Sequence, residues 1–462
     1  MKRLFVICAL MVIPALRMMA EVDPNFYIYI CFGQSNMEGN ADVEAVDRKN
    51  IDDRFRLLAT CKNGSRTMGN WYKATPSLVS PTGKLGPSDY FGRMMCEVLP
   101  KDIRIGVIPV AIGGCKIEMF DKDKYQTEVN KGDYSAGLAN THYGGNPYGR
   151  IIEMAKKAQE VGVIKGILLH QGCSNCNDSN WPNMVKKIYN DMLTDLGLAT
   201  DSVPLFVGET LRADQGGGCS SHNTQVARMP SVVKNSYVVS SEGCPGNGSD
   251  AWHFNAFGYR MLGARYAGEA LYTLGQHLPY FSFHDYMITL NSNCTYTEST
   301  RTLTAKSTGA GLATWNYPHI ADWSGSKYLV LKFKDETDPL TELILYKKGS
   351  TTASVGYRDT IQGRSTVVVD LHNLDLRGTV MNPAKVAKMV LRCPKGSKIV
   401  IDDIFLSDDE QYGEMLTGVR DVNTNKQSFQ APLYSLDGRL AGHRDALKPG
   451  IYFSNGKKIL VR

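Results

Sequence analysis

Residues 26–39 read Phe26-Tyr27-Ile28-Tyr29-Ile30-Cys31-Phe32-Gly33-Gln34-Ser35-Asn36-Met37-Glu38-Gly39. The apolar run 26–32 is typical of a buried strand, and a polar, glycine-containing turn follows it at once. Further apolar runs lie at 103–112, 163–169, 204–207 and 237–240, and segments with helical apolar spacing lie between or after them at 149–161, 181–196 and 255–274. This alternation predicts an α/β domain over residues 21–278, with a parallel sheet and helices on both faces.

The pattern changes near residue 280. Strand-like stretches separated by turn residues follow at 328–334, 342–347, 366–371, 388–393 and 398–406. They predict a β-sandwich over residues 279–410, with a possible role in carbohydrate binding. Residues 411–462 carry hairpin signals and predict a small all-β module.

The first twenty residues predict a signal peptide. Lys2 and Arg3 precede an apolar stretch that ends near Leu16, too short to span a bilayer, and Ala20 is a plausible cleavage edge. We therefore expect a secreted, periplasmic or cell-surface protein. Removal of Lys2, Arg3 and Arg17 lowers the net charge from +6 to +3. This small net positive charge argues against a nucleic-acid partner. Hydrophobic residues make up 43% of the chain and charged residues 21%, which excludes a disordered chain.

Polar residues at strand ends are the candidates for chemistry, because sites in such sheets form at the carboxyl ends of strands. Ser35 directly follows the first run, and a serine hydroxyl needs a base to act as a nucleophile. His253 is the candidate base, and Asp250 lies three residues before it, close enough for a turn to join the two side chains. Alone, a serine at such a turn is more often a turn or helix-cap residue, and a lone histidine is more often structural. Asp250 also fits an N-cap of the following helix, a role that is compatible with catalysis.

Two further strand ends carry candidate hydrogen-bond donors. Gly113 and Gly114 follow the run 103–112, and their backbone N–H groups can approach a ligand oxygen, although two glycines alone simply make a turn. His170-Gln171-Gly172-Cys173 follows the run 163–169, and the Gln171 amide can donate to the same oxygen. The sequence thus places a nucleophile, a base, an acid and donors at four strand ends of one domain.

These segments resemble the sequence blocks of SGNH hydrolases, specifically the group of carbohydrate esterase family 6 and sialate O-acetylesterases. The resemblance spans about residues 25–275 and rests on the block 33–37, the pair Gly113-Gly114 and the D-x-x-H-F block that starts at Asp250. It implies an SGNH-type three-layer fold and a mechanism with Ser35 as nucleophile, His253 as base and Asp250 as orienting acid. It implies Ser35, Gly114, Gly113 and Gln171 as oxyanion donors, with Gln34 beside them in the site.

One position departs from that pattern. Members of the group commonly carry His-Gln-Gly-Glu, and Cys173 stands at the glutamate position here. The resemblance also makes His170 a supporting residue rather than the base. Cys173 and Cys176 form a C-x-x-C pair, which we interpret as a structural disulfide or buried thiols, with a zinc half-site and a redox pair as alternatives.

Other groups have weaker interpretations. Aromatic residues in the loops are candidates for sugar stacking or for ordinary packing: Trp71, Tyr72, Tyr125, Tyr143 and Tyr148. Trp315, Tyr317 and Trp323 are candidates for a glycan site or a core in the sandwich, and residues 121–124 predict a solvated face. The C-terminal segment resembles the sorting tails of Bacteroidota secreted proteins, which implies outer-membrane secretion machinery as a partner.

Together these observations predict a secreted serine esterase that removes O-acetyl groups from a polysaccharide or oligosaccharide. Acetylated xylan is the leading substrate and O-acetylated sialic acid the alternative, and we expect neither a metal nor an organic cofactor. A non-catalytic glycan-binding surface protein with a degenerate esterase domain is the competing hypothesis, supported by Cys173.

Overall fold

The structure is a computed structural model that describes residues 22–348, 353–361, 363–376 and 379–417, together with short stretches at 419–421, 433–435, 440–442, 450–454 and 457–461. The predicted signal peptide 1–20 and most of the predicted module 411–462 lie outside the described residues. The chain divides into two compact units, one up to Ala270 and one from Leu271.

The first unit contains a seven-stranded sheet in the order β3-β2-β4-β1-β5-β6-β7. The central strand β1 pairs in parallel with β4 and β5, and the edge strand β3 runs antiparallel to β2. The strands are β1 (Phe26–Gly33), β2 (Phe55–Leu58), β3 (Trp71–Lys73), β4 (Arg104–Ala111), β5 (Val163–His170), β6 (Leu205–Gly208) and β7 (Ser236–Val239). The predicted parallel α/β sheet is confirmed.

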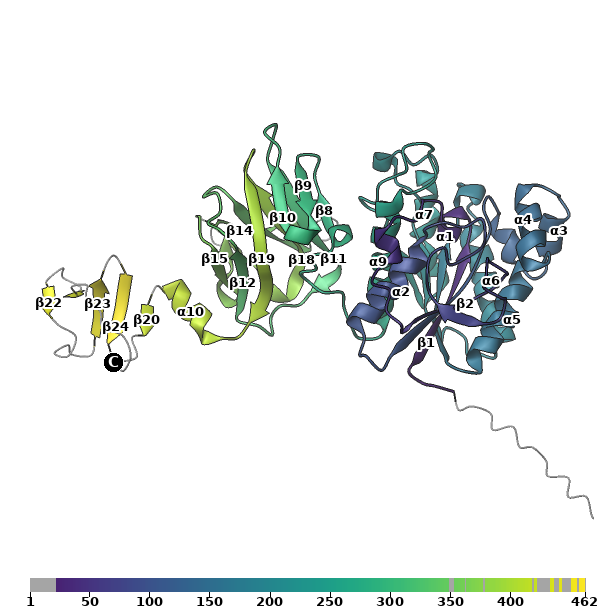
Figure 1. Cartoon of the computed structure of the whole chain (residues 1–462), viewed down its shortest axis with the longest axis horizontal. Helices are drawn as coiled ribbons and strands as arrows, with labels where there is room; N and C mark the ends of the chain where they lie inside the picture. The colour runs from purple at the N-terminus through teal and green to yellow at the C-terminus, as the bar shows by residue number, and fades with distance from the viewer. Residues whose placement is uncertain are drawn as a thin grey trace, which may run out of the picture. The chain divides into compact units, whose positions relative to one another are not determined.

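Helices cover both faces of this sheet (Figure 1). The longer ones are α2 (Pro87–Val98), α4 (Tyr134–Tyr143), α5 (Pro147–Gln159), α6 (Trp181–Asp195) and α9 (Ala256–Thr273), and shorter ones are α1 (Ser35–Glu38), α3 (Tyr125–Val129), α7 (Asn223–Val226) and α8 (Met229–Val232). Alternate residues of β1 serve the two faces. Ile28 and Ile30 share one core with Ile151 of α5, whereas Tyr29 packs edge-on against Phe91 of α2 with ring centroids 4.8 Å apart.

The second unit begins with two five-stranded antiparallel sheets, in the orders β15-β12-β19-β10-β9 and β14-β13-β18-β11-β8. Side chains of both sheets form one hydrophobic core, which defines a β-sandwich. The strands are β8 (Ile288–Leu290), β9 (Cys294–Thr297), β10 (Thr302–Ala305), β11 (Gly311–Ala321), β12 (Tyr328–Phe333), β13 (Glu342–Lys348), β14 (Ala353–Thr360), β15 (Thr366–Asp370), β18 (Val386–Cys393) and β19 (Lys398–Ser407). A short pair, β16 (Asp375–Leu376) and β17 (Thr379–Val380), lies outside them.

The aromatic residues proposed for a glycan site in the sandwich belong to its core. Trp315 and Trp323 are fully buried, and Tyr317 packs against the same cluster. Of the two alternatives for these residues, a glycan site or a core, the structure supports the core.

The chain continues into α10 (Glu410–Thr417) and a further sheet in the order β20-β24-β23-β21-β22. Its strands are β20 (Val419–Asp421), β21 (Leu433–Ser435), β22 (Leu440–Gly442), β23 (Gly450–Ser454) and β24 (Lys457–Val461).

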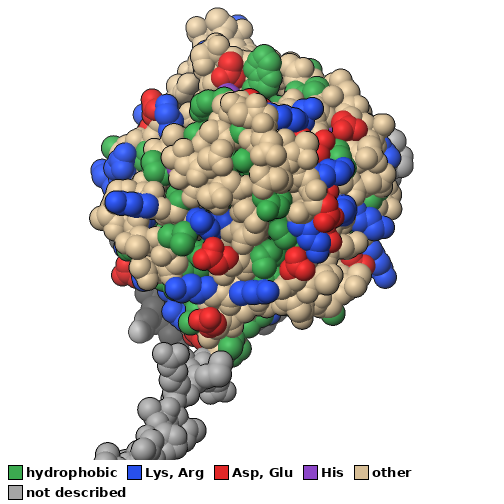
Figure 2. All heavy atoms as spheres, turned by 90° about the vertical axis from the view of Figure 1, so that its right-hand side faces the viewer, with side chains coloured by type: hydrophobic (Ala, Val, Ile, Leu, Met, Phe, Trp, Pro, Cys, Tyr) green, Lys and Arg blue, Asp and Glu red, His purple; other side chains and the backbone are tan. Residues whose placement is uncertain are grey.

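Two properties of the structure concern membranes and charged partners. Within the described part of the chain, no helix combines the length and the apolar character that crossing a membrane requires. On the face shown in Figure 2, blue and red side chains are interspersed rather than gathered into regions of one charge.

Candidate active site

The turn after β1 presents Ser35 at the carboxyl end of the sheet. Gly33 ends the strand with φ of 151°, and a Cβ at this position would lie 2.1 Å from the carbonyl oxygen of His170 on the neighbouring strand. Any side chain would therefore push the two strand ends apart. α1 begins immediately afterwards, and Ser35 is its first residue.

Three side chains from two distant segments form a continuous hydrogen-bonded chain. The Ser35 Oγ lies 2.8 Å from Nε2 of His253, and Nδ1 of His253 lies 2.8 Å from Oδ2 of Asp250. A base on one ring nitrogen and a carboxylate on the other is the arrangement that activates a serine hydroxyl. The structure thus brings together the three residues that the sequence singles out for catalysis.

Asp250 is fixed by the loop in which it lies. Its Oδ1 accepts hydrogen bonds from the backbone N–H groups of Trp252 and His253, and its Oδ2 accepts one from the Asn247 side chain. Burial raises the pKa of Asp250, but the hydrogen bonds from His253, Asn247 and the backbone outweigh it and hold this pKa well below the usual range. The carboxylate is therefore ionised at neutral pH and stabilises a positively charged imidazole.

Asp250 does not cap the following helix. The side chain of Asn255 accepts the hydrogen bond from the N–H of Gly258 in the first turn of α9. The alternative interpretation of Asp250 as that cap is therefore wrong. The Asp250 carboxylate instead accepts hydrogen bonds within the turn that carries His253.

Asn36 joins the two segments of the site. Its side chain donates to the carbonyl oxygen of Trp252 over 3.0 Å and accepts a 2.7 Å hydrogen bond from the hydroxyl of Tyr259 on α9. We did not single out Asn36 or Asn247 from the sequence. The available signal was their position, one beside Ser35 and the other three residues before Asp250.

Two backbone N–H groups beside Ser35 are available to a ligand. Among the described residues, neither the N–H of Ser35 nor that of Gly114 donates a hydrogen bond. Gly114 has φ of 74°, the left-handed region that glycine favours. Ser35, Gly113 and Gly114 line one pocket together with His253. Donors placed in this way can hold the negative oxygen of a tetrahedral intermediate.

Gln171 and Gln34 have hydrogen-bond partners outside the predicted oxyanion site. The fully buried Gln171 donates from Nε2 to the carbonyl of Cys115 and to Asn175 Oδ1, and its Oε1 accepts from the indole of Trp181. Its amide does not reach the pocket, so we withdraw its assignment as an oxyanion donor. Gln34 lines the pocket, but its Oε1 accepts the N–H of Gly172, so it supports the loop after β5.

A comparison with protein families matches residues 25–272 to the family described as carbohydrate esterase, sialic acid-specific acetylesterase (SASA). The chain belongs to the SASA family. Among solved structures, NanS shares 13% sequence identity with a TM-score of 0.42, over 55% of this chain and 99% of that chain. An Arabidopsis thaliana protein shares 20% identity with a TM-score of 0.41, over 54% and 99%. A family 11 carbohydrate-binding module of Clostridium thermocellum shares 15% with a TM-score of 0.19, over 26% and 83%.

His170 of this SASA esterase lies in the core rather than in the pocket. Its Nδ1 lies 3.2 Å from the hydroxyl of Tyr266, and its ring packs edge-on against Phe254. Burial lowers the pKa of His170 to about 3, so the ring stays neutral at physiological pH. The histidine that contacts Ser35 is His253.

Cys173 lines the pocket with a protonated thiol. Its pKa is raised to about 12, chiefly by burial and further by the charge of Asp250. Cys176 forms a disulfide with Cys219, 43 residues further along the chain. The two cysteines of the C-x-x-C pair therefore do not act together as a redox pair or a zinc half-site in this structure, because the Cys176 sulfur is bonded to Cys219 and Cys173 is a free thiol.

The pocket of the SASA esterase has a volume of about 430 Å³. Two exposed aromatic side chains line it, Trp252 beside His253 and Tyr134 at the start of α4. Both can stack on a sugar ring. Of the aromatic residues proposed for this role from the sequence, Tyr143 and Tyr148 are buried and Trp71 packs against Phe26.

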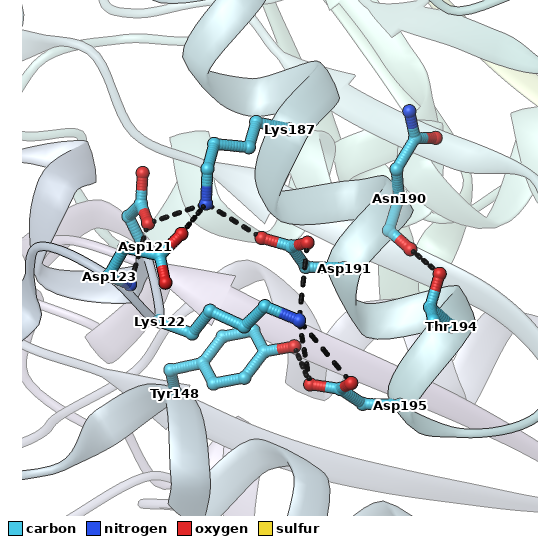
Figure 3. A network of polar contacts seen from close by, with 9 residues as sticks. All are labelled: Asp121, Lys122, Asp123, Tyr148, Lys187, Asn190, Asp191, Thr194 and Asp195. Atoms are coloured by element: carbon cyan, nitrogen blue, oxygen red, sulfur yellow. Dashed lines mark hydrogen bonds and ion pairs between the residues drawn. The ribbon is translucent and has the colours of Figure 1, made fainter.

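Among the described residues, one acidic group has metal-binding spacing, but a lysine occupies it. Asp121, Asp123 and Asp191 lie around the Lys187 ammonium at 2.8, 2.7 and 2.9 Å, as Figure 3 shows. Asp121 is only 1% exposed, so the predicted solvated face at residues 121–124 is wrong for Asp121, whereas Asp123 and Lys124 are exposed as predicted. The lysine supplies the positive charge that these carboxylates need, so the cluster ties α6 to the loop before α3.

Proposed function

We propose that this SASA esterase is a serine O-acetylesterase of glycans that works through an acetyl-enzyme. The chain of hydrogen bonds from Ser35 through His253 to Asp250, at the edge of a pocket with two free N–H groups, carries this proposal. The family supplies the substrate class, a carbohydrate ester.

The reaction has two halves in this arrangement. The Ser35 Oγ attacks the acetyl carbonyl carbon while His253 Nε2 takes the hydroxyl proton, and the N–H groups of Ser35 and Gly114 stabilise the resulting oxyanion. The intermediate collapses, and the departing sugar oxygen takes the proton from Nε2. Water then attacks the acetyl group, gives a proton to Nε2, and acetate leaves as the serine is restored.

Acetylated xylan is the leading substrate and O-acetylated sialic acid the alternative. Acetate release by the purified protein from a panel of both classes tests the proposal. We expect release from at least one glycan, and a loss of more than tenfold in the Ser35→Ala variant. Ser249→Ala is the matched control, because Ser249 is exposed in the loop that carries His253.

Two outcomes would contradict the proposal. An inactive wild-type protein that still binds glycans would favour the competing hypothesis of a degenerate esterase domain. Activity that survives in Ser35→Ala would place the nucleophile elsewhere.

A further inference from the structure

The pocket beside Ser35 contains one carboxylate and, among the described residues that line it, neither lysine nor arginine. The carboxylate belongs to Glu38, the last residue of α1. Glu38 is only 6% exposed, so its charge is poorly screened by water.

Glu38 is held in one orientation by the loop after β3. Its Oε1 accepts hydrogen bonds of 2.7 Å from the hydroxyls of both Ser80 and Thr82, which also lie 3.0 Å from each other. Fixed hydroxyl donors on one oxygen determine where the other oxygen lies.

The second oxygen, Oε2, lies on the side of the candidate oxyanion donors. It would be 3.1 Å from a Cβ on Gly113. Within the described part of the chain it accepts no hydrogen bond, and it is not among the buried polar atoms that lack a partner. Oε2 is therefore an open acceptor on the pocket wall.

A histidine lies next to Thr82. His142 Nε2 lies 3.3 Å from Oγ1 of Thr82. Burial lowers the pKa of His142, and this effect exceeds the opposing influence of the Glu38 charge. The His142 ring is accordingly neutral at pH 7 and does not offset the charge of Glu38.

We infer that Glu38 makes this site select O-acetyl esters of uncharged sugars, by accepting a hydrogen bond from a sugar hydroxyl, and discriminate against esters that carry a carboxylate. A hydroxyl that donates to a carboxylate forms one of the stronger hydrogen bonds in proteins. A substrate carboxylate in the same pocket meets a like charge without a cation to offset it. The inference rests on the proposed esterase function and favours acetylated xylan over O-acetylated sialic acid.

The test compares two substrates of nearly the same shape, one with a negative charge and one without. An O-acetylated methyl glucuronoside is offered as its free carboxylate and as its carboxamide, and kcat/KM for acetate release is measured for each at pH 7. We expect the wild-type protein to prefer the carboxamide at least tenfold. In Glu38→Gln, whose amide would present an N–H in place of Oε2, we expect this preference to fall at least fivefold. Glu160→Gln, which removes an exposed carboxylate at the end of α5, should keep the wild-type ratio.

A second measurement needs no variant and covers the case in which Glu38→Gln does not fold. The wild-type preference for the carboxamide should persist when the ionic strength is raised, because salt screens a buried charge such as that of Glu38 much less than exposed charges. A wild-type ratio near one, a preference that disappears at high salt and so belongs to exposed surface charges, or a ratio unchanged in folded Glu38→Gln would each overturn the inference. The absence of acetate release from every substrate would instead overturn the proposed function.

Discussion

The side-chain amide of Asn36 donates a 3.0 Å hydrogen bond to the carbonyl oxygen of Trp252, a residue 216 positions away in the sequence. Asn36 follows the candidate nucleophile and Trp252 precedes the candidate base. This bond therefore fixes the distance between the turn after β1 and the loop before α9, on which the contact of Ser35 with His253 depends.

Asn36→Ala should lower kcat about 10- to 100-fold and change KM little, because misplacement of catalytic groups by about 1 Å costs this much. Steady-state kinetics on an acetylated oligosaccharide give the two parameters separately. Asn183→Ala, at an exposed position on α6, is the control. A kcat within twofold of wild type would show that the bond does not position the site.

Asp250→Asn should lower kcat/KM by roughly 10²- to 10⁴-fold, because an amide cannot stabilise a protonated imidazole and can hold the wrong tautomer. Asp214→Asn, an exposed carboxylate in a nearby loop, should have no such effect. The lowered pKa of Asp250 also predicts how activity responds to acid. The carboxylate stays ionised at and somewhat below pH 4, the ordinary pKa of an aspartate, so protonation of Asp250 should not reduce activity above about pH 4. Equal activity of Asp250→Asn and wild type would remove Asp250 from the mechanism.

The sequence predicts one side of the central sheet better than the other. The run before Ser35 and the helices 181–196 and 255–274 are long and regular, and the structure has them as β1, α6 and α9. β2 and β3 were not assigned, because they span only Phe55–Leu58 and Trp71–Lys73 at the edge of the sheet, where periodicity carries little signal.

The residues of the candidate site also differ in how far the sequence predicts their roles. Ser35, Asp250 and His253 were predicted because their positions at strand ends and in a short motif suffice to bring them together. The direction of the Gln171 amide was not predictable, since it depends on contacts with Asn175 and Trp181 that only the folded chain creates. The role of Glu38 likewise depends on hydroxyls supplied by the loop after β3.

Lys187→Met should destabilise the first unit by about 1–3 kcal/mol, because it leaves the buried Asp121 carboxylate without its ion-pair partner, whereas Asp191 keeps Lys122. Lys186→Met, at the adjacent exposed position, should stay within about 0.5 kcal/mol of wild type. Chemical denaturation followed by the loss of esterase activity reports on this unit. Equal stability of the two variants would show that the network in Figure 3 contributes nothing measurable.

His170 should make the first unit less stable in acid. Burial lowers its pKa to about 3, whereas an unfolded histidine has a pKa near 6.5. Between these values the unfolded state binds a proton that the folded state does not, so the free energy of unfolding falls as the pH falls below about 6.5. At pH 4.5 this loss amounts to about 2–3 kcal/mol relative to pH 7.

The variant His170→Asn removes the titrating group and keeps a polar atom near Tyr266. Its free energy of unfolding should depend less steeply on pH between 7 and 4.5 than that of wild type, whatever its absolute stability. Identical slopes for the two proteins would mean that His170 is not held neutral by the fold.

The central claim is that Ser35 is the nucleophile of an esterase, and covalent labelling tests it most directly. A fluorophosphonate should modify the native protein once, and mass spectrometry of the digested protein should place the adduct on the peptide that contains Ser35. The Ser35→Ala variant should remain unlabelled, and an acetylated glycan substrate should slow labelling of the wild type. Labelling of another residue, or acetate release from a protein whose Ser35 is fully modified, would contradict the account.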